Sequence, residues 1–283
     1  MRITGQTRVA GVVGRPITHS LSPILHNAWI AAAGLDAVYV PFTVVDQRFE
    51  AFVEGMREAS ICGVNVSLPY KGRALVLADS ATERALSAGA ANVLVFQADG
   101  QTLADNTDGL GLLSAFASQA PDFDPSEAPV VIFGAGGGAQ GAAAAFLSAG
   151  CSDVRVINRN PDRALSLAAE LGDRVRGYGF HQAEEALARA GAIINATSAG
   201  LFDPDFVLPI ETAPQKAVVM DMVYKPLMTS VLRDAARRGH PIVDGLEMLI
   251  GQARPAFNAF FGQDPPASVP VRNLALAALE AQP

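Results

Sequence analysis

Short apolar stretches alternate with longer amphipathic stretches through the first hundred residues. Apolar stretches of this length predict β-strands, whereas an apolar period near 3.6 residues predicts helices. Such alternation predicts a mostly parallel sheet covered by helices. We expect strands at 8–14, 37–44, 61–67 and 91–96, and helices at 22–33, 46–59 and 71–79.

The alternation continues in the second half, after a helix at 107–118 and an exposed, proline-containing connection at 121–129. The fold class is therefore α/β, and the length suits two lobes with a cleft between them. The later strands are expected at 192–195, 217–222 and 241–243, and the last helices at 245–261 and 271–281.

A glycine-rich segment with the sequence VVIFGAGGGAQG occupies residues 130–141. An apolar strand leads into Gly134, Ala135, Gly136, Gly137 and Gly138, a small-residue helix is expected at 140–149, and a second strand at 153–158. A strand, a tight glycine turn and a helix N-terminus together suit the pyrophosphate of a dinucleotide, because the first N–H groups of the helix bind anions. The segment predicts a dinucleotide site.

The residues after the second strand, Asn158-Arg159-Asn160-Pro161-Asp162-Arg163, indicate which dinucleotide. Units that bind NAD usually place an acidic residue there for the ribose 2′-hydroxyl. Two arginines suit a 2′-phosphate instead, because guanidinium donors match phosphate oxygens, so we predict NADP. In the alternative, Asn160 only caps a helix and the arginines face solvent; both can hold together.

Charge and composition exclude several classes of partner. A net charge of −7 argues against nucleic acid or an anionic membrane as a partner. The apolar stretches are too short to span a membrane, and the first residues lack the apolar core of a signal peptide. Cys62 and Cys151 lie far apart without metal-ligand spacing, and the four histidines are scattered, so we expect reduced thiols, a cytoplasmic protein and no metal site.

Polar residues gather where the predicted strands of the first half end. Ser20 and Ser22 stand between a strand and a helix, where hydroxyls beside a helix N-terminus suit a small carboxylate. Ordinary capping, with Ser22 as the cap and Pro23 as the first helical residue, is the alternative.

Lys71 opens a predicted helix, where a cation is electrostatically unfavourable and therefore needs an acid or an anionic ligand nearby. Asp108 is a candidate partner for Lys71, although Asp105 or Asp108 can instead cap the next helix. Asn92 begins a strand, and Gln252 lies near the apolar side of a late helix. Taken together, these residues predict a site for a polyhydroxylated acid, although each alone is compatible with a structural role.

In order along the chain, these motifs resemble those of the shikimate dehydrogenase family. The resemblance covers nearly the whole chain. It is carried by HSLSP, GVNVSLPYK, GAANV, DNTDG, GAGGGAQG, NRNPDR, INATSAG, DMVY and DGLEMLIGQA.

The resemblance implies a substrate-binding domain formed by residues 1–108 plus 245–283, onto which the C-terminal helices pack, and a Rossmann-type NADP-binding domain at 109–244. It implies reversible reduction of 3-dehydroshikimate to shikimate with NADPH, with Lys71 as the catalytic lysine paired with Asp108. The resemblance is compatible with a homodimer and does not decide the oligomeric state. The substrate-binding residues that it implies are Ser20, Ser22, Ser67, Lys71, Asn92, Asp108, Tyr224 and Gln252.

The resemblance also implies which residues contact the cofactor, and the chain differs from the family's common sequence at some positions. Ser67 stands where the family commonly has threonine, and Asn160 also replaces a threonine, which affects the strictness of substrate and cofactor choice. The alternatives are a quinate/shikimate dehydrogenase of relaxed specificity, a catalytically dead dinucleotide-sensing protein and a methyltransferase. The paired arginines argue against the methyltransferase. The implied cofactor-binding residues are Glu83, Gly134, Ala135, Gly136, Gly137, Gly138, Asn158, Arg159, Asn160, Arg163, Thr197, Met222 and Gly245.

Overall fold

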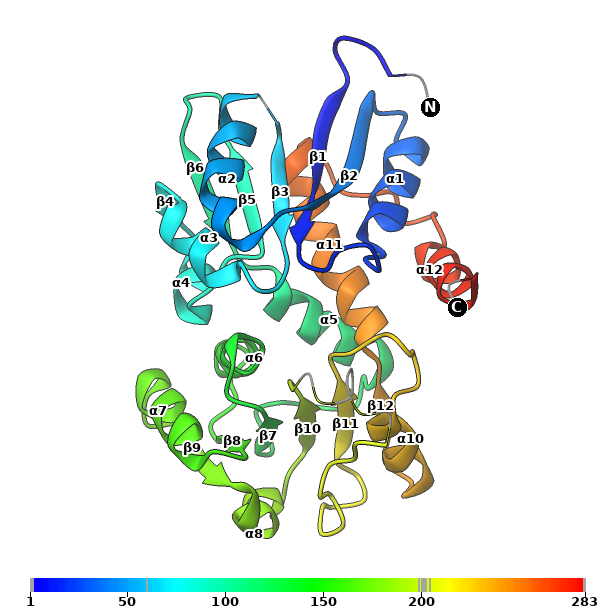
Figure 1. The fold of residues 1–283 in the computed structure, drawn as a ribbon. Helices are drawn as coiled ribbons and strands as arrows, with labels where there is room; N and C mark the ends of the chain where they lie inside the picture. The colour runs from blue at the N-terminus through cyan, green and yellow to red at the C-terminus, as the bar shows by residue number, and fades with distance from the viewer. Residues whose placement is uncertain (1–2, 60, 198, 200–202, 204, 282–283) are drawn as a thin grey trace. The chain divides into compact units, whose positions relative to one another are not determined.

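The computed structural model of the chain describes residues 3–59, 61–197, 199, 203 and 205–281 (Figure 1). Ser198 and Gly200 of the INATSAG motif lie outside these described residues. The chain divides into two compact units, unit 1 (Met1–Thr107 with Gln252–Pro283) and unit 2 (Asp108–Gly251). The division expected from the sequence fell just after Asp108 and just before Gly245; the second boundary instead lies inside a helix.

Unit 1 is built on a six-stranded sheet with the order β2-β1-β3-β5-β6-β4. β1, β2 and β3 are parallel, as predicted, but β5 runs antiparallel to both β3 and β6. The sheet is mixed because a tight turn at 97–101 joins β5 directly to β6, and such a turn can only connect antiparallel strands. The strands are β1 (Arg8–Gly14), β2 (Ala37–Thr43), β3 (Gly63–Val66), β4 (Ser80–Ala81), β5 (Val93–Phe96) and β6 (Thr102–Asp105).

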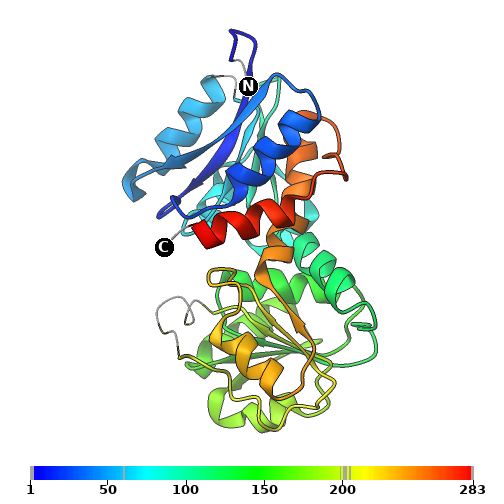
Figure 2. The ribbon, with the colours of Figure 1, turned by 90° about the vertical axis from the view of Figure 1, so that its right-hand side faces the viewer.

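Helices cover both faces of this sheet. Side chains of α2 and α3 pack with Val64 and Val66 on one face, and aromatic side chains of α1 and α11 cover the other. Figure 2 shows α12 beside α1. The helices are α1 (Ser22–Ala32), η1 (Asp46–Arg48), α2 (Phe49–Glu58), α3 (Lys71–Leu77), α4 (Glu83–Ala88), α11 (Gly245–Phe261) and α12 (Val271–Ala281).

An aromatic cluster of His26, Trp29, Tyr39, Phe257 and Phe260 forms the core between the sheet and these helices. The His26 ring stacks on Tyr39 with 4.0 Å between ring centroids and meets Trp29 edge-on. His26 is fully buried, and burial lowers its pKa to about 3. Neither ring nitrogen of His26, nor Nε1 of Trp29, has a hydrogen-bond partner among the described residues. His26 is therefore neutral in the folded protein.

We expect the buried His26 to make the protein less stable as the pH falls. The unfolded chain binds a proton at this residue near pH 6.5, whereas the folded chain does so only near pH 3. The free energy of unfolding should therefore fall by about 2 kcal/mol between pH 6.5 and 5 through this residue. In urea titrations at the two pH values, His26→Phe should remove most of this loss, whereas the exposed His181→Gln should leave it. Equal losses in His26→Phe and the unmodified protein would contradict the prediction.

Unit 2 contains a second six-stranded sheet, with the order β12-β11-β10-β7-β8-β9. All five pairings between neighbouring strands are parallel. A parallel sheet of this kind fits the Rossmann-type domain that the resemblance implied. Its strands are β7 (Val130–Phe133), β8 (Val154–Asn158), β9 (Val175–Gly179), β10 (Ala192–Asn195), β11 (Val218–Asp221) and β12 (Ile242–Val243).

The helices of unit 2 form a layer on each face of the sheet. Apolar residues of α5, α6 and α7 pack on one face, and those of α8 and α10 pack on the other. None of the helices in the described part of the chain is long and apolar enough to cross a membrane. The helices are α5 (Asp108–Gln119), α6 (Gly137–Ser148), α7 (Pro161–Leu171), η2 (Phe180–Gln182), α8 (Ala183–Leu187) and α10 (Ser230–Arg237).

Candidate active site and cofactor site

In unit 1, the predicted substrate-binding residues follow the carboxyl ends of two neighbouring parallel strands. Val13 of β1 is paired with Val66 of β3, so the segments that leave the two strands start side by side. A β-carbon at Gly14 would lie only 2.9 Å from Cβ of Ser67, so position 14, at the end of β1, requires glycine. Ser20 follows β1, and Ser67 and Lys71 follow β3, which places these polar residues at one edge of the sheet.

The two serines have different environments. The backbone N–H of Ser22 donates to Oγ of Ser20 at 3.3 Å. The prediction that Ser22 caps α1 is wrong, because the cap position is Leu21 and no side chain caps this helix. Ser22 is 9% exposed and its side chain lies against the Tyr39 hydroxyl. Burial raises the pKa of Tyr39 well above its usual value, and the Ser22 side chain acts in the opposite direction.

Lys71 is the first residue of α3, as the sequence predicted. The preceding residue, Tyr70, is fully buried, stacks on Phe49 and donates its hydroxyl to the carbonyl of Val44. The carbonyl of Lys71 accepts from the N–H of Ala91 at 2.9 Å, beside the start of β5. Packing thus fixes the backbone of Lys71 at the helix N-terminus, next to the segment that carries Asn92.

Asn92 and Gln252, far apart in the sequence, are brought together. Nδ2 of Asn92 donates to Oε1 of Gln252 at 3.1 Å, and Oδ1 of Asn92 accepts from the N–H of Thr107 at 2.8 Å. Asn92 is 2% exposed, whereas Gln252 is half-buried. Sequence reasoning did not single out Thr107 or Asn65, whose Nδ2 donates to the Asn92 carbonyl. A polar residue within the apolar strand sequence GVNV was the available signal for Asn65.

Asp105, one of the two acids considered for helix capping, instead bonds residues at the start of α4. Its carboxylate accepts from Nε and Nη2 of Arg84, from the Thr82 hydroxyl and from the N–H of Asn106. These bonds hold the end of β6 against the start of α4. Asp108 is the first residue of α5 and directly follows Thr107. The pairing of Lys71 with Asp108 stays a prediction.

In unit 2, the glycine turn between β7 and α6 has the geometry of an anion site. Gly134 has φ of +116°, and a β-carbon there would lie 3.0 Å from the carbonyl oxygen of Ala196. Gly136 is the cap residue of α6 and supplies no side chain to its first N–H groups. A β-carbon at Gly136 or Gly137 would meet nothing within 4 Å, so the backbone is open to a ligand. These features fit a dinucleotide pyrophosphate.

Helix α6 begins at Gly137, three residues before the predicted start at Gln140. Glycine disfavours helix, which is why the sequence suggested the later start. Tertiary packing overrides this preference, because Ala139 is fully buried against β7. Gly138 is therefore also helical, and the exposed turn is correspondingly shorter.

The loop after β8 combines both predicted features. Oδ1 of Asn160 accepts from the N–H of Asp162 at 3.0 Å, so Asn160 caps α7, and Pro161 is its first residue. Nδ2 of Asn158 donates to the carbonyl of Asn160. Arg159 and Arg163 are exposed, and the ion pairs found within the described ranges do not involve them. Hydrogen bonds thus tie the loop backbone to the start of α7, while the two guanidinium groups remain accessible to a phosphate.

The other predicted cofactor residues of unit 2 adjoin the glycine turn. The N–H and the hydroxyl of Thr197 both donate to Oδ1 of Asn195, the last residue of the buried strand β10. Sδ of Met222 would lie 3.7 Å from a β-carbon at Gly138, and a β-carbon at Gly245 would clash with the Met222 backbone at 2.6 Å. The half-buried Ala135 lies in the turn itself, and the half-buried Tyr224 follows Met222.

Two residues behind this site were missed by sequence reasoning. Nδ2 of Asn195 donates to Oδ1 of Asp221, and both residues are fully buried. Burial raises the pKa of Asp221, and hydrogen bonds from Thr229, Val223 and Asn195 oppose this rise. The carboxylate thus fixes the Asn195 amide that holds Thr197. In unit 1, the predicted cofactor residue Glu83 is exposed at the start of α4.

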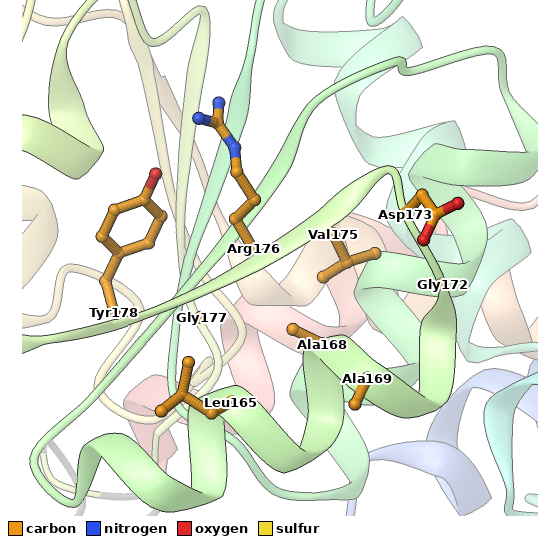
Figure 3. A pocket seen from close by; sticks show the side chains of 9 residues that line it. All are labelled: Leu165, Ala168, Ala169, Gly172, Asp173, Val175, Arg176, Gly177 and Tyr178. Carbon is orange, nitrogen blue, oxygen red and sulfur yellow. The ribbon is translucent and has the colours of Figure 1, made fainter.

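A hollow of about 410 Å³ lies elsewhere in unit 2, between α7 and β9. Figure 3 shows Leu165 and Ala168 on α7 opposite Val175 on β9, with Arg176 and Tyr178 further along the strand. None of the predicted site residues lines this hollow. It is an open depression between a helix and an edge strand, separate from the candidate site.

Three family models match the chain. They describe a shikimate dehydrogenase substrate binding domain at residues 12–94, a shikimate/quinate 5-dehydrogenase at 116–204 and a shikimate 5′-dehydrogenase C-terminal domain at 245–269. The shikimate dehydrogenase (NADP(+)) of Caulobacter vibrioides is 54% identical over 280 residues, which is 98% of each chain. The chain belongs to the shikimate dehydrogenase family.

Solved structures of this family have the same fold. A shikimate dehydrogenase in complex with NADP+ superposes with a TM-score of 0.89, at 31% identity over 98% of both chains. The shikimate dehydrogenase of Thermus thermophilus in complex with NADP(H) and shikimate has a TM-score of 0.85, at 34% identity, covering 96% of this chain and 99% of that one. The two-unit α/β architecture is therefore the family's fold.

Proposed function

We propose that this protein is an NADP-dependent shikimate dehydrogenase that reversibly reduces 3-dehydroshikimate to shikimate. The observation that carries the proposal is the 54% identity, along nearly the whole chain, with a curated shikimate dehydrogenase (NADP(+)). The structure supports it independently, because lysine, amide and hydroxyl groups gather at one edge of the unit 1 sheet, while unit 2 offers an open glycine turn. Unit 1 holds the substrate and unit 2 the cofactor.

Lys71 supplies the proton in this mechanism. NADPH, when bound, provides the hydride that reduces the C3 carbonyl carbon of 3-dehydroshikimate. The Lys71 ammonium stabilises the negative charge that develops on the carbonyl oxygen and donates a proton to it, which completes the hydroxyl. In the reverse reaction the neutral amine takes that proton from the C3 hydroxyl. Asp108 orients the Lys71 side chain.

The remaining polar residues orient the ring. Ser20 and Ser22, with Tyr224, bind the ring carboxylate, and the hydrogen bond from the Ser22 N–H to Oγ of Ser20 fixes the position of the Ser20 hydroxyl. Ser67, Asn92 and Gln252 bind the ring hydroxyls. Asn92 and Gln252 already bond each other, so they do not have to be ordered when the substrate binds.

The cofactor is held by unit 2. The N–H groups at the start of α6 and the open glycines Gly136 and Gly137 suit the pyrophosphate, and Arg159 and Arg163 suit the 2′-phosphate. Thr197, Met222 and Gly245, at the carboxyl ends of the parallel strands, are positioned for the nicotinamide half.

The purified protein should be assayed with shikimate and quinate, each with NADP+ and with NAD+, by the absorbance of reduced nicotinamide. We expect kcat/KM to be highest for shikimate with NADP+, with at least about a tenfold preference over NAD+ from the charge-assisted phosphate contacts. Comparable turnover of quinate with NAD+ would instead assign a quinate/shikimate dehydrogenase of relaxed specificity. Tight NADP+ binding without oxidation of either acid would assign a non-catalytic dinucleotide sensor.

A further inference from the structure

A line of hydrogen bonds runs behind the substrate-binding residues of unit 1, from Tyr39 through Asn65 and Asn92 to Gln252. We infer that Tyr39 is a positioning residue: its hydroxyl binds Oδ1 of Asn65 and holds the amide in the orientation that leaves one N–H for the substrate, which strengthens the binding of shikimate. The inference rests on the proposed function. Tyr39 lies on β2 and was not among the residues expected from the sequence to bind substrate or cofactor.

The orientation of Asn65 follows from the groups around it. Its amide lies 3.1 Å from the carbonyl oxygen of Asn92, which can only accept, so Nδ2 must point there. Oδ1 therefore points to the Tyr39 hydroxyl at 2.7 Å, and that hydroxyl must donate. The oxygen of Asn65 is thus satisfied inside the protein. Its second N–H remains for a ligand, since Asn65 is only half-buried.

The same reasoning fixes Gln252. The N–H of Thr107 can only donate, so Oδ1 of Asn92 must face it and Nδ2 must face Gln252. Gln252 therefore directs Oε1 to Asn92 and keeps Nε2 for the site. Within the described part of the chain, Nε2 takes part in none of the hydrogen bonds found. Two amides from different elements, Asn65 and Gln252, are both set to donate.

A pair of donors in this position suits a substrate whose periphery is oxygen. The carboxylate, hydroxyl and carbonyl oxygens of a polyhydroxylated ring acid all accept hydrogen bonds. If the Asn65 amide turned over, its oxygen would face these oxygens, and lone pairs would oppose each other. The orientation of the amide therefore contributes directly to affinity.

Packing and hydrogen bonds hold Tyr39 in place, so that its hydroxyl can anchor the Asn65 amide in this orientation. It is 1% exposed, and its ring stacks on His26 within the aromatic cluster. Asn27 of α1 bonds both backbone groups of Tyr39: Nδ2 donates to its carbonyl at 2.8 Å, and Oδ1 accepts from its N–H at 3.0 Å. The Ser22 side chain lies against the same hydroxyl, so one group touches two parts of the substrate site.

Tyr39→Phe tests the inference, because it removes the hydroxyl and keeps the ring in the cluster. We expect KM for shikimate to rise about 5- to 20-fold, with KM for NADP+ unchanged within about twofold. A merely structural role would lower thermal stability without this split between the two KM values. Tyr178→Phe, the same change on β9 of unit 2, should leave both KM values unchanged. An unchanged KM for shikimate in Tyr39→Phe would overturn the inference.

A second measurement does not depend on catalysis. In ¹H–¹⁵N NMR spectra, the Asn65 side-chain proton that bonds the Asn92 carbonyl, assigned with an Asn65→Ala variant, should be protected from solvent exchange in the unmodified protein. It should exchange about tenfold faster in Tyr39→Phe, because the amide is no longer held at Oδ1. Equal exchange in both proteins would overturn the inference. If the unmodified protein did not turn over shikimate, the proposed function would be wrong, yet these resonances would still decide whether Tyr39 orients Asn65.

Discussion

Replacing Lys71 by methionine should lower kcat for shikimate oxidation by about 10³- to 10⁴-fold. The change removes both the group that exchanges the proton and the positive charge beside the developing alkoxide, and general acid–base catalysis alone contributes about 10²- to 10⁴-fold. Methionine keeps most of the side-chain volume at the start of α3, so the backbone contact between Lys71 and Ala91 should persist. KM for shikimate should change by less than about tenfold, because the serines and amides still bind the ring.

Lys216→Met is the matched control. Lys216 is exposed in a turn of unit 2, and its replacement removes the same charge from the protein. It should leave kcat and both KM values unchanged. Steady-state kinetics with shikimate and NADP+, together with circular dichroism to verify folding, would measure the effect. A folded Lys71→Met protein with near-normal kcat would remove lysine from the chemistry.

Replacing Arg159 and Arg163 together by alanine should abolish the preference for NADP+ over NAD+. Charge-assisted hydrogen bonds contribute about 1.5 to 3 kcal/mol each, so kcat/KM with NADP+ should fall by about 10²- to 10⁴-fold. The values with NAD+ should stay within about threefold, because NAD+ has no 2′-phosphate for these residues to bind. The cap that Asn160 gives to α7 does not depend on either arginine, so the loop should keep its conformation.

A control variant with the same net charge separates the loss of the phosphate contacts from the effect of net charge on cofactor binding. Arg48→Ala with Arg57→Ala also removes two positive charges, but from unit 1, where Arg57 pairs with Asp79. It should lower kcat/KM with both cofactors equally and by less than about threefold, through the net charge alone. If the Arg159 and Arg163 double variant lost activity with NAD+ and NADP+ to the same extent, the two arginines would not recognise the 2′-phosphate.

The elements with strong periodicity were predicted well from the sequence. The strand 8–14, the strand 192–195 and the helices 245–261 and 271–281 have the predicted bounds. In each of them the apolar pattern is continuous, and turn or capping residues mark the ends. The glycine segment was equally informative, because only glycine allows the backbone conformation at Gly134.

Other elements were missed because their signal is not local. β4 and β12 are two residues long and exist only through pairing with their neighbours, and β4 was not predicted. β6 was also missed, and with it the antiparallel direction of β5, because residues 102–105 contain only two apolar side chains. Strand propensity depends on the neighbours that a sheet supplies, and a single sequence does not name them.

The candidate site likewise contains residues that the sequence indicates and residues that only the structure reveals. Residues at the ends of elements, such as Ser20 and Lys71, were predicted as site residues from the sequence because a charge or hydroxyl there requires a reason. Tyr39 and Asn65 lie inside apolar strands, where tyrosine and a single amide attract no attention. Only the fold shows that they bond each other and that Asn65 bonds the backbone carbonyl of Asn92, whose own side chain bonds Gln252.

Because unit 2 is one uninterrupted segment of the chain, Asp108–Gly251, it can be exchanged with that of a relative as a single gene fragment. Two residues proposed to act on the substrate, Asp108 and Tyr224, would travel with it. A graft designed to replace NADP by NAD would therefore also import the donor's acid partner for Lys71 and one of its carboxylate ligands. Moving the first junction to follow Asp108 would keep the native acid, and comparing the two chimeras would separate its contribution from that of the cofactor.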